Sequence, residues 1–178
     1  MVEELMLQDA LQEEQAIIEE LRILAWLLGI PCQESLDEID LLARQYSWLT
    51  TGAEQLKELP LAQWQAEHTR LFISGFPKTI AIPFESVYLT GEMGGSAQES
   101  LNHFLQTIGL EAEEGMADYL GTLLEALAYL LEQKDEQMSS ELKDKHLHKW
   151  VRRFADDVKQ NSKVILYQSL ADRLLMHF

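Results

Sequence analysis

The chain has 178 residues, of which 47% are hydrophobic, and its 30 acidic and 14 basic residues give a net charge of −16. This length and apolar content suit one folded domain with a real core and exclude a largely disordered chain. Because so negative a surface repels phosphate backbones and anionic lipid head groups, no nucleic acid partner is expected; the acidic surface either keeps the protein in solution or attracts a basic partner.

Three features indicate the compartment. The single cysteine, Cys32, cannot form an internal disulfide, which fits a reducing environment. Acidic residues follow Met1, so the basic start of a secretory signal is missing. No apolar run approaches the ~18 residues that a membrane span requires. We therefore expect a cytoplasmic protein without stable membrane insertion.

Helical periodicity recurs in the first half of the chain, whereas the alternation typical of strands does not. Apolar residues from Leu11 to Leu28 fall at three- and four-residue steps and predict a first helix. The remaining predicted elements of this half are a helix opened by a capping box of Ser35 and Glu38, a short helical turn at about 53–59, and a helix that starts at Pro60 and is ended by Gly75 and Pro77.

The second half is also predicted to be helical. Its most apolar helix is expected at about 118–133, where leucines cover a face wide enough for a central position. The other predicted helices are one opened by a capping box of Ser96 and Glu99 and closed by Gly109, one capped by Ser139 or Ser140 and broken at Asn161 and Ser162, and a last one from about Val164 to Leu175.

The predicted fold class is therefore all-α. We expect a single helical domain over residues 1–178, with about eight to ten helices. A hinge segment at about 74–95 is expected to join an N-terminal helical part to a C-terminal one.

Motifs that carry catalysis are missing. The sequence has no phosphate-binding glycine loop, no H-E-x-x-H and no C-x-x-C. His146 and His148 are two residues apart, so they should point to different faces of a helix, and we interpret them as surface histidines rather than as metal ligands. Cys32 has no histidine nearby to activate it. We predict no catalytic residues, no metal site and no cofactor, and hence no enzyme.

His68 shares the apolar stripe of Trp64, Leu71 and Phe72. One interpretation is a core histidine with one hydrogen-bond partner. The other places His68 on the wall of a binding groove. Periodicity alone does not separate these two possibilities.

The stretch from Arg70 to Leu89, R-L-F-I-S-G-F-P-K-T-I-A-I-P-F-E-S-V-Y-L, interrupts the helical pattern with two prolines and a glycine and contains one carboxylate, Glu85. From Glu67 to Tyr88 the chain reads E-x-x-R-L-F, a variable loop, and then P-F-E-S-V-Y. This pattern resembles the signature of the TorD/DmsD family of redox-enzyme maturation chaperones, which is related to the NarJ group. The resemblance extends over nearly the whole chain.

The chain departs from the family pattern at four positions. Ile82 replaces the first proline of the family's P-P-aromatic-E-S-V-Y element, and Ala117 and Tyr119 replace the proline and histidine of its P-D-H element. His68 stands where an aromatic residue is usual. These departures leave open the client enzyme and any binding of guanine nucleotide.

The resemblance implies a cytoplasmic chaperone that binds the twin-arginine signal peptide of a molybdenum-enzyme precursor and delays export until the cofactor is inserted. Such a leader joins a basic head to an apolar segment, so its receptor needs an apolar groove with acidic groups at one end. The residues we expect to bind the peptide are His68, Leu71, Phe72, Pro83, Phe84, Glu85, Ser86, Tyr88, Asp118 and Tyr119.

Each of these residues also has a structural interpretation. Leu71 and Phe72 could be ordinary core, and Glu85 could cap a helix or bind backbone amides. Ser86 and Tyr88 could fix the loop through bonds to the backbone, and Asp118 could cap its own helix.

Two rival functions remain from the sequence. One is an adaptor or assembly factor that binds a folded oxidoreductase subunit without recognising a signal peptide; the other is a small helical enzyme or nucleotide-dependent switch. The sequence does not identify the client enzyme or any contact with the cofactor-insertion machinery. It allows a monomer or a domain-swapped dimer.

Overall fold

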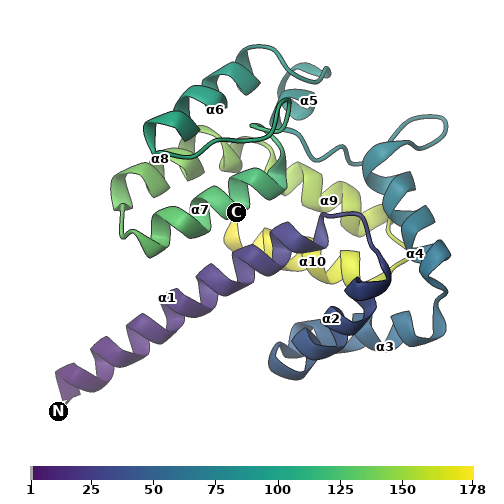
Figure 1. Ribbon diagram of the computed structural model, residues 1–178, viewed down its shortest axis with the longest axis horizontal. Helices are drawn as coiled ribbons and strands as arrows, with labels where there is room; N and C mark the ends of the chain where they lie inside the picture. Colours follow the sequence, from purple (N-terminus) through teal and green to yellow (C-terminus); the bar gives the residue numbers. More distant parts are fainter. Residues whose placement is uncertain (1) are drawn as a thin grey trace. The chain divides into compact units, whose positions relative to one another are not determined.

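The computed structural model describes residues 2–178, with side chains described for Met6 and from Gln8 onward. Ten α-helices and three short helical turns make up the described chain, and no β-strand occurs in it (Figure 1). The all-α prediction is therefore confirmed. No helix in the described part combines the length and apolar character needed to cross a membrane.

Contacts divide the chain into two compact units, each assembled from two separate segments. Unit 1 comprises the residues up to Leu28 and Phe84–Leu147, and unit 2 comprises Gly29–Pro83 and His148–Phe178. Each unit thus takes one segment from each half of the chain, so the two units are interleaved along the sequence. The second of the three boundaries, between Pro83 and Phe84, falls inside the segment expected to be a hinge.

Unit 1 is built around α7. The long helix α1 packs along α7, and α8 and the pair of α5 and α6 complete the unit. The buried leucines of α7, such as Leu123, Leu124 and Leu127, give it the central position that its wide apolar face predicts. The helices of unit 1 are α1 (Val2–Leu27), α5 (Glu85–Thr90), α6 (Ser96–Thr107), α7 (Leu120–Glu132) and α8 (Glu136–Lys145).

Unit 2 is centred on the antiparallel neighbours α9 and α10, with α3 against α10 and α2 against α3. Gly52 on α3 lies so close to α10 that a Cβ there would be 3.0 Å from the Leu166 Cα, so a larger residue would require the two helices to move slightly apart. The helices of unit 2 are α2 (Gln33–Gln45), α3 (Thr50–Glu58), α4 (Leu61–His68), α9 (Val151–Asn161) and α10 (Ile165–His177). The short turns are η1 (Ser47–Leu49), the π-helical η2 (Thr69–Ile73) and η3 (Leu147–Lys149), which spans the boundary between the units.

Several predicted caps are wrong although the helices exist. α2 begins earlier than expected, with Cys32 at its N-cap, and Ser35 lies in its first turn, where its Oγ accepts a hydrogen bond from the Cys32 N–H. Ser96 is the first residue of α6, after Gly95, and makes no cap. The cap of α8 is Asp135, whose carboxylate accepts from the Met138 N–H at 3.0 Å; it is neither Ser139 nor Ser140.

Candidate functional site

The residues expected to bind a peptide fall in both compact units. His68, Leu71, Phe72 and Pro83 belong to unit 2. The others, from Phe84 to Tyr88 together with Asp118 and Tyr119, belong to unit 1. We describe each set within its own unit.

In unit 2, Leu71 and Phe72 are core residues. Leu71 has no exposed surface, and the Phe72 ring stacks on Phe154 at 6.0 Å and meets Tyr167 edge-on at 5.1 Å. Both side chains come from η2, where the chain widens into a single π-type turn closed by the Ser74 N–H on the Thr69 carbonyl. Such turns insert one residue into a helix and often accompany functional sites.

His68 is a buried histidine with a defined partner. The Tyr167 hydroxyl accepts a hydrogen bond from the Trp64 indole N–H at 3.0 Å and is also hydrogen-bonded to His68 Nδ1 at 2.9 Å. Burial lowers the pKa of His68 to about 4 and keeps the imidazole neutral at physiological pH. This is the arrangement expected of a core histidine.

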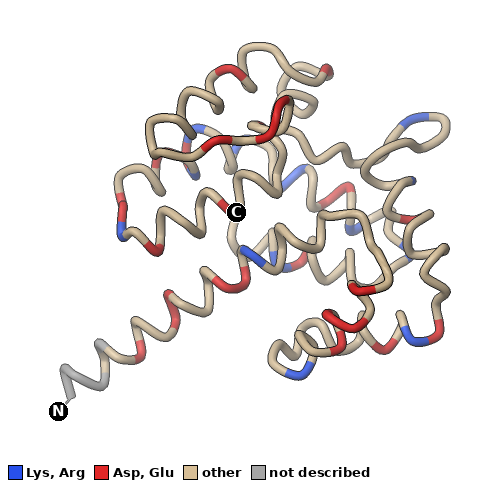
Figure 2. The backbone as a smooth tube through the Cα atoms, in the orientation of Figure 1, with Lys and Arg blue, Asp and Glu red and all other residues tan. Residues whose placement is uncertain are grey.

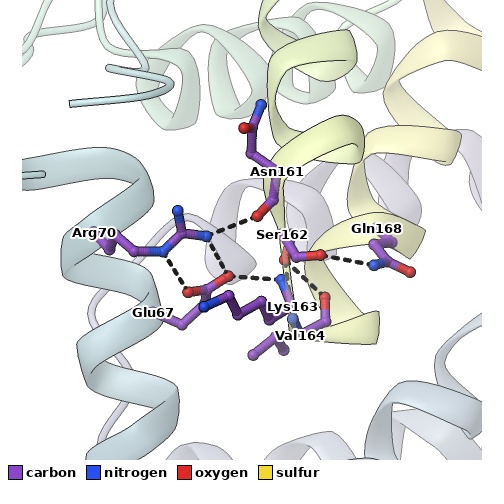
Figure 3. Close-up of polar contacts among 7 residues, drawn as sticks. All are labelled: Glu67, Arg70, Asn161, Ser162, Lys163, Val164 and Gln168. Atoms are coloured by element: carbon purple, nitrogen blue, oxygen red, sulfur yellow. Dashed lines mark hydrogen bonds and ion pairs between the residues drawn. The ribbon is translucent and has the colours of Figure 1, made fainter. Parts of the chain in front are cut away.

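Glu67, the neighbour of His68, carries a buried carboxylate for which we predicted no role from the sequence. Glu67 accepts two hydrogen bonds from the Arg70 guanidinium, at 2.7 and 2.8 Å, and a third from the backbone N–H of Lys163 at 2.7 Å (Figure 3). Arg70 also donates to the carbonyl of Asn161, the last residue of α9. Burial by itself would raise the pKa of Glu67, but the bonds from Arg70 and Lys163 outweigh it and hold that pKa below its ordinary value.

The Glu67–Arg70 pair therefore fixes α4 and η2 against the turn between α9 and α10. Figure 3 shows the same turn held by Ser162, whose hydroxyl bonds Val164 and whose carbonyl accepts from the Gln168 amide. Three residues separate Glu67 and Arg70, which is a spacing that brings side chains together on one helix face. That spacing was the available sequence signal. The partners on α9 and beyond, however, lie 91 and 96 positions away.

In unit 1, Asp118 caps a helix other than its own. Its Oδ2 accepts the N–H of Ser86 at 2.9 Å and its carbonyl accepts the N–H of Glu85 at 3.0 Å, so it closes the start of α5. The interpretation that Asp118 caps the following helix is therefore wrong, because α7 begins at Leu120 with Tyr119 at its N-cap. Asp118 is completely buried, and its side chain serves the backbone of α5.

Glu85 is paired with His146. The two side chains are 2% and 10% exposed, and Glu85 Oε1 lies 2.9 Å from His146 Nδ1. The interpretation of His146 as a surface histidine is wrong, whereas His148 is exposed as expected. Residue spacing could not reveal this pair, because 61 positions separate its members.

Tyr119 lies directly after Asp118 and forms contacts of its own with Leu28 and Phe84. Its hydroxyl donates to the carbonyl of Leu28 at 2.9 Å, its backbone forms an isolated bridge with Phe84, and burial raises its pKa to about 12. A Cβ on Gly121 would come within 2.5 Å of the Tyr119 ring, so glycine at this position is what admits the ring.

We name Glu85, Asp118, Tyr119 and His146 the junction cluster. Leu28, Phe84 and Leu147 are the residues of unit 1 at which the chain passes to or from unit 2. The cluster bonds Leu28 directly, includes the neighbour of Phe84 and includes the neighbour of Leu147. The junction cluster therefore forms hydrogen bonds at or next to all three positions where the chain passes between the units. Tyr119 bonds Leu28, and the Glu85–His146 pair links the neighbours of Phe84 and Leu147.

The remaining expected residues differ in accessibility. Pro83, Phe84 and Ser86 are buried, and the Ser86 hydroxyl accepts the Gly94 N–H at 3.0 Å. Tyr88 and Tyr119 are half-buried. In the described part of the chain, no group of three or more His, Cys, Asp or Glu side chains is arranged to hold a metal ion.

A solved structure has a fold similar to that of this chain. A crystal structure of a candidate redox enzyme maturation protein from Archaeoglobus fulgidus superposes with a TM-score of 0.68 at 24% sequence identity, covering 90% of this chain and 94% of the other. No curated protein matches the sequence significantly.

The fold is that of the redox-enzyme maturation chaperones, a class whose members are typically not enzymes. Residues 31–161 match the model of the nitrate reductase delta subunit family. The chain belongs to this family, the NarJ family, and the resemblance found from the sequence is confirmed at that level. Family membership implies a partner of the nitrate reductase type, a molybdoenzyme subunit.

Proposed function

We propose that the protein is a cytoplasmic chaperone that binds the twin-arginine signal peptide of a molybdenum-containing oxidoreductase precursor and delays its export until the cofactor is inserted. The observation that carries the proposal is the family match over residues 31–161, a span that contains both the Glu67–Arg70 pair and the junction cluster. No catalytic step is part of this function.

The buried members of the expected site have a positioning role in this proposal. Glu85 already binds His146, which an arginine of the leader would have to displace. Asp118 is completely buried and binds the Ser86 N–H through Oδ2, so an arginine could reach its unbonded Oδ1 only by entering the interior of unit 1. A buried carboxylate without its partner is costly. We therefore propose that the buried residues hold the backbone near the chain exits and that the half-exposed Tyr88 and Tyr119 contact the peptide.

An exposed loop supplies apolar surface in unit 2. After η2 the chain turns back, and Gly75 permits this because a Cβ there would come within 2.8 Å of the Arg70 carbonyl. The loop presents Phe76 fully exposed, with Pro77 and Lys78 at its tip, next to Ile73, the last residue of η2, which is 52% exposed. Exposed apolar side chains gathered on one loop are suited to contact the apolar segment of a leader.

Calorimetric titration tests the proposal. The full chain should bind a synthetic twin-arginine leader, and a leader with both arginines replaced by lysines should bind more weakly, because a guanidinium stacks on aromatic rings such as those of Tyr88 and Tyr119 better than an ammonium does. The variant Phe76→Ser should weaken binding about 5- to 20-fold through lost apolar contact. Leu89→Ser, at another exposed apolar position, is the matched control. The absence of binding by any leader would contradict the proposal.

A second candidate function is favoured by the same family match. An adaptor that grips a folded oxidoreductase subunit would need no leader, and the family is one of nitrate reductase delta subunits. The burial of Glu85 and Asp118 also fits this candidate, because neither carboxylate is presented to an incoming arginine. Binding of a catalytic subunit lacking its leader, together with no binding of the leader alone, would select the adaptor.

A further inference from the structure

Unit 1 contains a pocket that no residue of the junction cluster lines. It has a volume of about 310 Å³ and lies beside α7, between the end of α6 and the Arg22 side chain of α1. Its apolar walls are Leu105, Leu110, Ala126 and Tyr129. All of these elements belong to one compact unit.

The pocket exists because of side-chain sizes on α7. Thr122, Ala126 and Tyr129 follow one another at four- and three-residue steps and so share a face of the helix. The first two are small and leave space, whereas Tyr129 is a half-buried wall. On the other side α6 stops at Thr107, and the Leu110 N–H bonds the Leu105 carbonyl at 2.9 Å, which brings Leu110 back over the end of the helix.

The rim of the pocket is acidic. Glu111 and Glu125 line it, and both are exposed. Glu113 and Glu114 follow on the same exposed segment between α6 and α7, which Figure 2 shows as an acidic stretch. Arg22 also lines the pocket and offsets one of these charges, since it pairs with Glu132 through two hydrogen bonds of 2.7 Å and with Glu125 at 3.7 Å. The carboxylates of Glu111, Glu125 and Glu132 still outnumber this single cation.

The size of the pocket selects the occupant. A dry cavity of about 150 Å³ accepts one benzene ring, so this volume, which is open at its mouth, suits one or two bulky apolar side chains. The acidic rim favours neighbouring cations and disfavours acids. We propose that this pocket docks a cationic segment of a partner protein by taking one of its aromatic or leucine side chains, while Glu111 and Glu125 hold flanking lysine or arginine residues.

This docking site is independent of the proposed leader contacts, and its test uses a different probe. The probe is a short synthetic peptide with one phenylalanine flanked on each side by lysines, titrated into the full chain by calorimetry. One comparison peptide replaces the phenylalanine by alanine, and a second replaces the lysines by glutamates. Binding should fall at least 10-fold for the first and be lost for the second.

Variants then locate the contact. Thr122→Trp should fill the pocket from its rim and weaken the probe at least 10-fold, whereas Asn102→Trp, on an exposed position of α6 outside the pocket, should leave binding unchanged. The double variant Glu111→Gln with Glu125→Gln should weaken binding about 3- to 10-fold and reduce its salt dependence. Its control is Glu54→Gln with Glu58→Gln, two exposed acids of unit 2.

If the Thr122→Trp variant does not fold, cross-linking to the unaltered protein can still support or contradict the proposal. A probe with a photoreactive phenylalanine should attach to residues 105–111 and 122–129 of the unaltered protein. Attachment elsewhere, or equal binding by the Thr122→Trp and Asn102→Trp variants, would overturn this proposal. That result would not contradict the proposed leader-binding function, which rests on other residues.

Discussion

Each compact unit buries a histidine and a glutamate with an identified partner, but the two units pair these side chains differently. In unit 2, Glu67 binds Arg70 and His68 binds the Tyr167 hydroxyl, so the carboxylate and the imidazole have separate partners. In unit 1, Glu85 and His146 bind each other. The arginine guanidinium is always charged and offers a carboxylate two parallel donors, whereas an imidazole offers one nitrogen. Glu67 therefore has a permanently charged, two-point partner, and Glu85 has a single imidazole nitrogen as its partner.

The largest expected effect comes from breaking the Glu67–Arg70 pair. Glu67→Ala should lower the free energy of unfolding by about 3 kcal/mol, because it leaves Arg70 and the Lys163 N–H without their acceptor; the value is at the low end for a buried pair because Arg70 is partly exposed. Denaturant titration measures the loss. The exposed Glu58→Ala is the control and should change stability by less than about 0.5 kcal/mol. Equal effects of both substitutions would show that the pair does not hold unit 2 together.

The next effect is a pH dependence from His68. Its pKa is about 4 in the folded protein against an ordinary 6.5, so the unfolded chain binds the proton first as the pH falls. The stability contribution of neutral His68 is complete above about pH 6.5 and is lost progressively down to about pH 4, amounting to roughly 2–3 kcal/mol. Urea titrations across this range measure it. His68→Asn should flatten the dependence, whereas His103→Asn, at an exposed position, should not.

The Glu85–His146 pair gives a smaller expected change. Glu85→Gln should reduce stability by about 1–2 kcal/mol, because the amide keeps a hydrogen bond to His146 but loses the charge. Melting and leader titration on the same variant sharpen the comparison between the units. A loss of stability with unchanged leader affinity assigns Glu85 to the scaffold, while weaker leader binding at unchanged stability would mean that the carboxylate itself meets the peptide.

The smallest expected effect is on the link to Leu28. Tyr119→Phe removes the hydroxyl that donates to the Leu28 carbonyl and should cost about 1 kcal/mol. Tyr129→Phe, on the same unit but outside the junction cluster, serves as the control. Hydrogen exchange should accelerate near Leu28 in the first variant only. Unchanged hydrogen exchange near Leu28 would show that the Tyr119 hydroxyl does not stabilise the backbone there.

The helices were predictable because their signals are local. Apolar spacing placed α7 and α10 correctly, and the helix stops near Gly29 and at Asn161 were recognised. Caps were less predictable, since Ser35, Ser96 and Asp118 all have capping chemistry but the neighbouring chain decides which helix start each one meets. Asp118 illustrates the limit, because it closes a helix whose start lies about thirty positions earlier in the sequence.

The sequence by itself determined the helical fold class, the central position of α7, the importance of the segment around Glu85 and the family, because periodicity and short motifs survive in a linear reading. Only the tertiary structure decided the partners of the buried charges: Glu67 with Lys163, Glu85 with His146 and Tyr119 with Leu28. The physical reason is that a buried polar group must find a partner wherever folding brings one within hydrogen-bond distance, and that distance in space has no fixed relation to separation along the chain.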